Sequence, residues 1–337
     1  MLVQYINQIF DGKALSSKMI SEALELITSG TVPAVQVGAF LTALRMKGIT
    51  GDELLGGAKM LRNNALYINS AQRNLVDIVG TGGDCSMSFN ISTTSSFVIA
   101  GAGVPVAKHG NRASSSLCGA ADVLEALGYN LDAPVELIEY SIAEYGIGFL
   151  YARKMHPLLG KVGALRRELR IRTIFNLLGP LCNPVNVDCM VLGVYAPELT
   201  ELFAEVLKKL GMKRAMVVHG MDGLDEISSC APTRVSELKD DYIKTYELLP
   251  ELLLGSVASP EELQGGNPKT NGAILKGILH GEIRHGARSA VLLNAGAAIY
   301  TYGKAADLAE GVKMAAESID SGAALQKLNT LIEVSNG

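Results

Sequence analysis

A glycine-rich stretch at residues 77–93, DIVGTGGDCSMSFNIST, combines residue types that hold anions. Glycines at 80, 82 and 83 let a backbone approach a ligand closely, and the segment NIST (90–93) is typical of a helix start, whose free N–H groups attract negative charge. The stretch lacks the lysine of a Walker loop, and Cys85 stands where a dinucleotide fingerprint needs glycine. We interpret it as a phosphate-binding loop of another kind. A tight strand-to-helix turn is the alternative.

A second candidate anion loop, KHGNR followed by three serines, occupies residues 108–116 and follows the apolar run VPVA. Lysine, arginine and hydroxyl groups are donors that suit phosphate oxygens. Two such loops after neighbouring strands favour one shared anion site. An ordinary solvated loop of the same composition is the alternative.

Two adjacent carboxylates, Asp225 and Glu226, follow a third apolar run, AMVVHG. Carboxylates are ligands that Mg²⁺ uses together with substrate phosphates. An acidic pair on a loop is often only solvated surface, but its place after a strand favours a metal site here.

A basic stretch at residues 165–172, LRRELRIR, is the fourth candidate. Arg166 and Arg170 are expected one helical turn apart, so one of them could clamp a carboxylate. On composition alone, a basic surface or a nonspecific nucleic-acid patch is the favoured interpretation.

The spacing of apolar residues predicts the scaffold for these motifs. Residues 1–70 show helical spacing and no strand pattern, so we expect a small α-helical domain, with a segment near 160–185 packed against it. Over residues 71–337, apolar runs alternate with helical segments, which is typical of an α/β domain with a mostly parallel central sheet. Residues 234–249 alternate in a more polar way and predict an antiparallel excursion. Ligands usually bind at the carboxyl ends of parallel strands, where the first three motifs fall.

The bulk composition excludes several classes of protein. The chain has 337 residues, 48% of them hydrophobic, and its formal net charge of −4 argues against a nucleic-acid-binding surface spread over the protein. Its five cysteines are scattered without a C-x-x-C pair, which fits reduced thiols better than disulfides or zinc. No apolar run is long enough to span a bilayer and no signal peptide is evident, so we expect a cytoplasmic protein without a membrane partner.

Five ordered blocks resemble the anthranilate phosphoribosyltransferase family: GTGGD with NIST, KHGNR with its serines, ADVLEALG, RTIFNLLGPLCNP and DEIS. They lie between residues 80 and 228, and the helical start and glycine-rich end extend the resemblance over nearly the whole chain. The resemblance implies a homodimer whose active site lies between a helical and an α/β domain. It also implies Mg²⁺-dependent transfer of phosphoribosyl from 5-phosphoribosyl 1-pyrophosphate to the amino group of anthranilate. The products would be N-(5-phosphoribosyl)anthranilate and pyrophosphate, in the second step of tryptophan biosynthesis from chorismate.

The resemblance further implies roles for individual residues. The phosphoribosyl donor would be held by Gly80, Gly83, Asp84, Ser88, Asn90, Ile91, Ser92, Thr93, Lys108, His109, Gly110, Asn111, Arg112, Ala113, Ser114, Ser115, Ser116 and Ala120. Anthranilate would face Gly80, Asn111 and Arg166. Of two Mg²⁺ ions per subunit, Ser92 and Glu226 would hold one, and Asp225 and Glu226 the other. No acid–base residue is assigned, because the aniline nitrogen is already a nucleophile at neutral pH.

Some positions depart from the family pattern. Cys85 replaces a common glycine, LCGA (117–120) replaces a more polar stretch, and Arg170 replaces a usual glycine. Ala120 lacks a hydroxyl for a phosphate oxygen, a loss of about 1 kcal/mol. Three alternatives therefore stay open: a pyrimidine-nucleoside phosphorylase-like enzyme, a phosphoribosyltransferase paralogue for another aromatic amine, and a nucleic-acid-binding paralogue. The acidic pair makes the last the least favoured.

Overall fold

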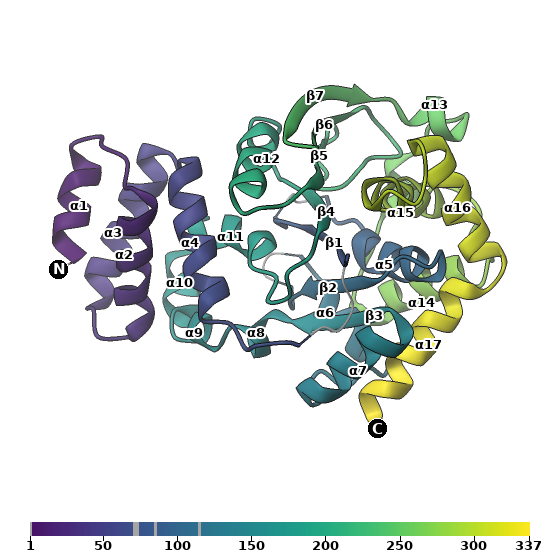
Figure 1. The fold of residues 1–337 in the computed structure, drawn as a ribbon, viewed down its shortest axis with the longest axis horizontal. Coiled ribbons are helices and arrows are strands. Elements are labelled where there is room, and N and C mark those ends of the chain that lie inside the picture. The colour runs from purple at the N-terminus through teal and green to yellow at the C-terminus, as the bar shows by residue number, and fades with distance from the viewer. Residues whose placement is uncertain (1, 70–73, 84–85, 114–115) are drawn as a thin grey trace.

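A computed structural model describes residues 2–69, 74–83, 86–113 and 116–337 of the chain (Figure 1). It contains a helical N-terminal domain beside a larger α/β domain with a seven-stranded sheet. Four positions singled out above lie outside the described residues: Asp84, Cys85, Ser114 and Ser115.

The N-terminal domain consists of helices α1 (Leu2–Phe10), α2 (Ser17–Ser29), α3 (Ala34–Lys47) and α4 (Gly51–Asn63). Local signals set their ends. Helix α2 stops at Gly30, whose φ of 80° is left-handed, and α4 starts with a capping box between Thr50 and Glu53. The prediction of a helical start to the chain is confirmed.

The sheet contains β1 (Val76–Gly80), β2 (Val106–Gly110), β3 (Ile147–Tyr151), β4 (Cys189–Gly193), β5 (Arg214–Gly220), β6 (Thr233–Lys239) and β7 (Tyr242–Leu248). Their order in space is β3-β2-β1-β4-β5-β6-β7. Strands β1 to β5 are parallel, whereas β6 and β7 each run antiparallel to their neighbour. The mostly parallel sheet and the antiparallel excursion are therefore confirmed. Strand β3 was not anticipated.

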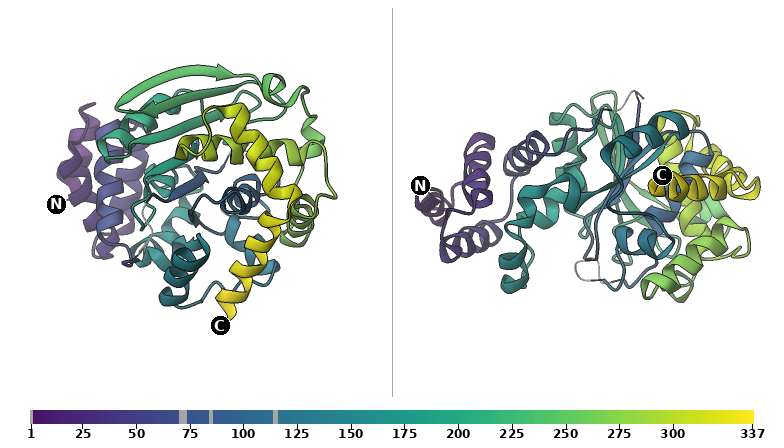
Figure 2. Two further views of the ribbon diagram at one scale, coloured as in Figure 1. Left: turned by 45° about the vertical axis from the view of Figure 1, so that its right-hand side comes forward. Right: turned by 90° about the horizontal axis from the view of Figure 1, so that it is seen from below.

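The remaining helices surround this sheet. They are α5 (Ile91–Gly101), α6 (Ala120–Ala126), α7 (Val135–Tyr145), α8 (Ala152–Met155), α9 (Pro157–Gly160), α10 (Gly163–Leu169), α11 (Ile174–Leu178), α12 (Leu199–Lys209), α13 (Pro250–Leu254), α14 (Pro268–Leu279), α15 (Ala287–Tyr302), α16 (Leu308–Asp320) and α17 (Ala323–Asn336). Figure 2 shows the C-terminal helices on the side of the sheet away from the N-terminal domain. None of the described helices is long and apolar enough to cross a membrane.

Two apolar cores lie on opposite faces of the sheet. Because side chains alternate along a strand, Val191 of β4 packs into the core with α5 and α15, while Met190 and Leu192 pack into the core with α12 and the N-terminal helices. Both faces are thus buried, as is usual for a parallel sheet.

The segment from α9 to α11 contacts the N-terminal domain: α9 touches α2, α10 touches α3, and α11 touches α3 and α4. Polar contacts add to this packing. Arg62 donates from Nε to the carbonyl of Leu181 at 2.7 Å, and Arg45 donates from Nη1 to the carbonyl of Arg172 at 2.9 Å. The domain boundary at residue 70 falls outside the described residues and stays a prediction.

The strand order places a switch point between β1 and β4. The chain runs outward from β1 through β2 to β3 on one side, and from β4 to β5 on the other. Ligands of open α/β sheets bind at the carboxyl ends of the strands beside such a point. Here these ends are Gly80 and Gly193, which are paired in register.

Candidate active site

The loop after β5 that carries Asp225 and Glu226, called the acidic loop below, lies directly on the ends of β1 and β4. A Cβ added to Gly193 would lie 1.6 Å from the carbonyl oxygen of Asp225, and one added to Gly80 would lie 2.2 Å from its Oδ2. At Gly193 the obstacle is backbone, so only glycine lets the loop come so close, whereas at Gly80 a Cβ would push the Asp225 carboxylate away from the strand end. The sequence motif explained Gly80 but not Gly193.

The two carboxylates of this loop contact the other predicted motifs. Asp225, which is buried, accepts a hydrogen bond at Oδ2 from the backbone N–H of Gly82 at 2.6 Å. Glu226 accepts at Oε1 from the backbone N–H of Ser92 at 3.2 Å. The glycine loop, the first turn of α5 and the acidic pair therefore converge at the switch point.

Lys108 supplies a positive charge at the same place. Its side chain is buried, and Nζ donates to the carbonyl of Ile78 at 2.7 Å and to Oγ of Ser92 at 3.4 Å. Burial lowers the pKa of Lys108, while the nearby carboxylates of Asp77, Glu226 and Asp225 act in the opposite direction. The ammonium group thus links β1 to the hydroxyl predicted as a metal ligand.

His109 lies on the other face of the sheet, because neighbouring side chains of β2 point in opposite directions. Its ring packs edge-on against His156 with 5.2 Å between centroids. Burial, followed by the influence of His156 and Lys108, lowers the pKa of His109 well below its ordinary value, so the ring is neutral at pH 7. Its side chain is therefore separated from Ser92 by the sheet.

Asp77 is a site-supporting residue that sequence reasoning missed. Its fully buried carboxylate accepts from the backbone N–H of His109 at 3.2 Å and from Nδ2 of Asn183 at 2.9 Å. Asn183 also donates to the carbonyl of Ala107 at 2.8 Å, so this network joins β1, β2 and the segment before β4. Burial raises the pKa of Asp77 to about 6. The sequence did offer one indication of such a residue, because Asp77 is a single acidic residue inside the apolar run VDIV.

Asn90 connects the two predicted donor loops. Its Nδ2 donates to the carbonyl of Cys118 at 3.2 Å, and its Oδ1 accepts from Nδ2 of Asn271 at 2.9 Å and from the thiol of Cys118 at 3.3 Å. Just before Asn90, Ser88 forms an isolated antiparallel β-bridge with Gln264, which fixes this part of the glycine-rich stretch. Cys118, a departure from the family pattern, is thus integrated into the loop packing.

Asp122 accepts hydrogen bonds at both ends of the loop that carries the three serines, residues 113–119, called the serine loop below. Its Oδ2 accepts from the backbone N–H groups of Ala113 at 2.8 Å and Gly119 at 2.9 Å. Arg112 forms ion pairs with Asp122 at 2.9 Å and with Glu125 at 2.7 Å, so its guanidinium is directed toward α6. Hydrogen bonds to Glu125 and Asp122, together with the charge of Glu125, raise the pKa of Arg112.

The basic stretch divides into two environments. Arg166 of α10 lies over the ring of Phe175 at 5.4 Å, and burial lowers its pKa. Helix α10 ends at Leu169, and Arg170 has a φ of 50°, so the expected helical turn from Arg166 to Arg170 is wrong. The left-handed conformation of Arg170 explains why a glycine is usual there.

Arg172 was not predicted as a site residue, yet it contacts the glycine loop. It donates from Nη2 to the carbonyl of Gly83, and its guanidinium stacks on the ring of Tyr195 at 4.1 Å. Since Arg45 of α3 donates to the carbonyl of Arg172, this residue connects the N-terminal domain to the glycine loop.

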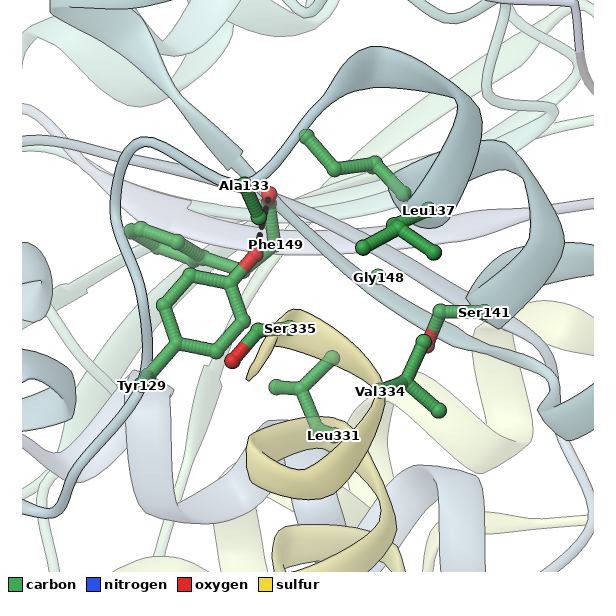
Figure 3. Close-up of a pocket in the computed structure, with 10 residues that line it drawn as sticks. Tyr129, Ala133, Leu137, Ser141, Gly148, Phe149, Leu331, Val334 and Ser335 are labelled. Carbon is green, nitrogen blue, oxygen red and sulfur yellow. Dashed lines mark hydrogen bonds between the residues drawn. The ribbon is translucent and has the colours of Figure 1, made fainter. Parts of the chain in front are cut away.

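A small cavity lies elsewhere, between α7, β3 and α17 (Figure 3). Tyr129, Ser141 and Ser335 supply its polar groups, and each hydroxyl donates to a backbone carbonyl. No predicted site residue lines it.

Comparison with known proteins identifies the family. Residues 3–65 match the family described as "Glycosyl transferase family, helical bundle domain", and residues 72–325 match "Glycosyl transferase family, a/b domain". The anthranilate phosphoribosyltransferase of Syntrophobacter fumaroxidans is 50% identical over 336 residues, which cover 100% of this chain and 99% of that protein. This chain belongs to the anthranilate phosphoribosyltransferase family. The enzyme of Desulfosudis oleivorans is also 50% identical, over 100% of both chains.

Solved structures of the anthranilate phosphoribosyltransferase family share the fold. The Thermus thermophilus enzyme matches with a TM-score of 0.93 at 40% identity, over 99% of both chains. The Saccharomyces cerevisiae enzyme in complex with PRPP (5-phosphoribosyl 1-pyrophosphate) and Mg matches with a TM-score of 0.91 at 29% identity, over 99% of this chain and 98% of that one. The same yeast enzyme in complex with 4-fluoroanthranilate matches with a TM-score of 0.89 at 28% identity, over 99% of this chain and 97% of that one.

Proposed function

We propose that this enzyme transfers the phosphoribosyl group of PRPP to the amino group of anthranilate, the second step of tryptophan biosynthesis from chorismate. The observation that carries the proposal is the convergence of Asp225 and Glu226 on the glycine loop and on Ser92, at the switch point of the sheet. A sugar diphosphate needs both anion donors and a cation, and these motifs supply the residues for both.

The donor is held, in this proposal, by backbone N–H groups of the glycine loop, by the first turn of α5 and by the serine loop. The set is the one inferred from the family resemblance, without the His109 side chain, which lies on the other face of the sheet. It includes Asp84, Ser114 and Ser115, which lie outside the described residues. Lys108 contributes its charge through Ser92, to which it donates. Asn90 and Asp122 keep the two loops in place by the contacts described above.

Magnesium fits the residues at this site, because carboxylate and hydroxyl oxygens are the hard ligands it prefers. Ser92, Asp225 and Glu226 would hold two ions per subunit. The described residues contain no cluster of three or more histidine, cysteine, aspartate or glutamate side chains able to hold a metal, so the remaining ligands would be water and donor oxygens. When bound, Mg²⁺ neutralises the charge that develops on the departing pyrophosphate. The yeast structure with PRPP and Mg supports this assignment.

In this proposal anthranilate faces Gly80, Asn111 and Arg166, and Arg166 pairs with its carboxylate. The aniline nitrogen carries a free electron pair at neutral pH, so orientation against the ribose C1 replaces general-base catalysis. The yeast complex with 4-fluoroanthranilate supports an acceptor of this class. A cytoplasmic homodimer completes the proposal.

The test is the loss of anthranilate fluorescence when PRPP and Mg²⁺ are added to the purified enzyme. We expect turnover that stops when the metal is chelated and that is specific for anthranilate among aromatic amines. A folded protein without turnover at saturating substrates would overturn the proposal. Metal-independent phosphorolysis of pyrimidine nucleosides would instead indicate a pyrimidine-nucleoside phosphorylase-like enzyme. Preference for another aromatic amine would indicate a phosphoribosyltransferase paralogue.

A further inference from the structure

The acidic loop is held from two sides. In front, the carboxylates of Asp225 and Glu226 accept hydrogen bonds from Gly82 and Ser92. Because the same carboxylate oxygens are proposed to bind a cation, these hydrogen bonds alone cannot fix the backbone of Asp225 and Glu226. This backbone must therefore also be held on its other side, toward α15.

Asn294 of α15 provides this support. Its side chain is fully buried, its Oδ1 accepts from the backbone N–H of Ile227 at 2.9 Å, and its Nδ2 donates to the carbonyl of Ile227 at 2.8 Å. The N–H of Ile227 belongs to the planar peptide that joins it to Glu226. One carboxamide therefore fixes the plane of the peptide beside the predicted metal ligand.

A third hydrogen bond fixes the carboxamide itself. Nδ2 also donates to the carbonyl of Ala290, one turn earlier on α15, at 2.9 Å, which uses the second amide hydrogen. A side chain with both donors and its acceptor engaged in a dry interior has one favourable orientation.

Helix α15 is a common support for both halves of the metal site. It packs against α5, β1, β4 and β5, and Figure 1 shows α15 beside α5 on the same side of the sheet. Ser95 of α5 donates to the carbonyl of Val291 at 3.4 Å, and α5 also carries Ser92. The separation of Ser92 and Glu226 is therefore set through one buried helix.

We propose that Asn294 is a positioning residue for the divalent-cation site. It holds the Glu226–Ile227 peptide so that Glu226 faces Ser92, and it touches neither substrate nor cation. The inference rests on the proposed function, since it assumes that these carboxylates bind a metal. Groups that orient metal ligands usually change metal affinity by about 10- to 100-fold when they are removed.

The experiment compares Asn294→Leu, which keeps the number and branching of the side-chain heavy atoms but removes all three hydrogen bonds, with the milder Asn294→Ser. The control is Thr301→Val on the same helix, where a buried hydroxyl donates to the carbonyl of Ala297 at 2.7 Å. Two quantities are measured in the full-length enzyme: Mn²⁺ binding in the presence of PRPP, by electron paramagnetic resonance, and the Mg²⁺ concentration for half-maximal activity.

We expect both Asn294 variants to bind Mn²⁺ more weakly, by about 10-fold or more for Asn294→Leu, and to need correspondingly more Mg²⁺. At saturating Mg²⁺ their kcat should recover substantially, and Thr301→Val should stay within about twofold of wild type in both readouts. Unchanged Mn²⁺ binding in a folded Asn294 variant would overturn the proposal. So would failure of both variants to fold while Thr301→Val folds, because Asn294 would then be a purely structural residue. If the wild type binds Mn²⁺ but does not turn over anthranilate, the proposed reaction is refuted, and the role of Asn294 is not.

Discussion

The two ends of the KHGNR motif differ sharply in environment. Lys108 is 3% exposed and donates to Ile78 and Ser92 inside the sheet, whereas the side chain of Arg112 is 39% exposed and pairs with Asp122 and Glu125 on α6. One motif therefore supplies both a buried charge beneath the site and a solvated charge at its edge. Charge type alone does not reveal this difference, because the strand ends between the two residues, at Gly110.

Departures from the family pattern fall on both sides of this division, because Cys118 is buried among the loops. Leu117 and Arg170 are exposed positions around the site, while Asp77, Lys108 and the acidic pair lie inside it. A substitution at a solvated edge changes few contacts, but one beneath the sheet leaves a buried partner unsatisfied. The comparison predicts which substitutions should matter.

The largest effect is expected for Lys108→Met. At pH 7.5 it should lower the free energy of unfolding by about 3 kcal/mol, because it removes the buried charge that favours the Asp77 carboxylate and leaves the carbonyl of Ile78 without its donor. At pH 5 the loss should be smaller, since Asp77 is then largely protonated. Urea unfolding at the two pH values measures both. An equal loss at both would show that Asp77 and Lys108 do not interact.

The second effect concerns Asp77→Asn and pH. Burial raises the pKa of Asp77 from 3.8 to about 6, so the folded chain takes up this proton at a higher pH than the unfolded chain does. Protonation of Asp77 therefore raises the free energy of unfolding as the pH falls from 6 to 4. This stabilisation is lost as the pH rises through 6. Between pH 4 and 7 the wild type should lose roughly 2.5 kcal/mol of stability relative to the variant, which cannot titrate. Parallel pH profiles for the two proteins would contradict this.

A smaller gain is expected for Arg170→Gly. The φ of 50° at the end of α10 is unfavourable for arginine, and glycine should stabilise the protein by about 1 kcal/mol. Thermal unfolding measures the gain, and activity should stay within about twofold. A loss of activity would place the Arg170 side chain in the reaction.

The smallest effect on stability is expected for Arg112→Met, the matched counterpart of Lys108→Met. Removing exposed ion pairs should cost about 0.5 kcal/mol, with little dependence on pH between 5 and 7.5. The same urea titrations check it. A cost as large as that of Lys108→Met would erase the distinction between the two ends of the motif.

Sequence patterns predicted the parts of the site that are local in the chain. Gly80, Ser92 and the acidic pair stand at strand ends or helix starts, which apolar periodicity locates. The supports could not be predicted in this way, because their partners are remote: Asn183 bonds Asp77 across 106 residues, and Asn294 bonds Ile227 across 67. A buried asparagine has no periodic signature, so only the fold reveals its partner.

Two errors have local causes. Strand β3 was missed because it follows α7 after a single residue, Gly146, which left no loop to mark a boundary. Arg166 and Arg170 were expected one helical turn apart, but α10 ends after Leu169, where Arg170 adopts a conformation that glycine favours. Charged residues with helical spacing concealed the end of the helix.

The central claim is that Asp225 and Glu226 bind the donor through Mg²⁺. Isothermal calorimetry of PRPP binding, with and without Mg²⁺, tests it most directly in the wild type and in Asp225→Asn/Glu226→Gln. We predict that Mg²⁺ strengthens PRPP binding to the wild type by at least about tenfold and has no such effect on the double variant. A folded double variant whose PRPP affinity still rises with Mg²⁺ as in the wild type would contradict the account.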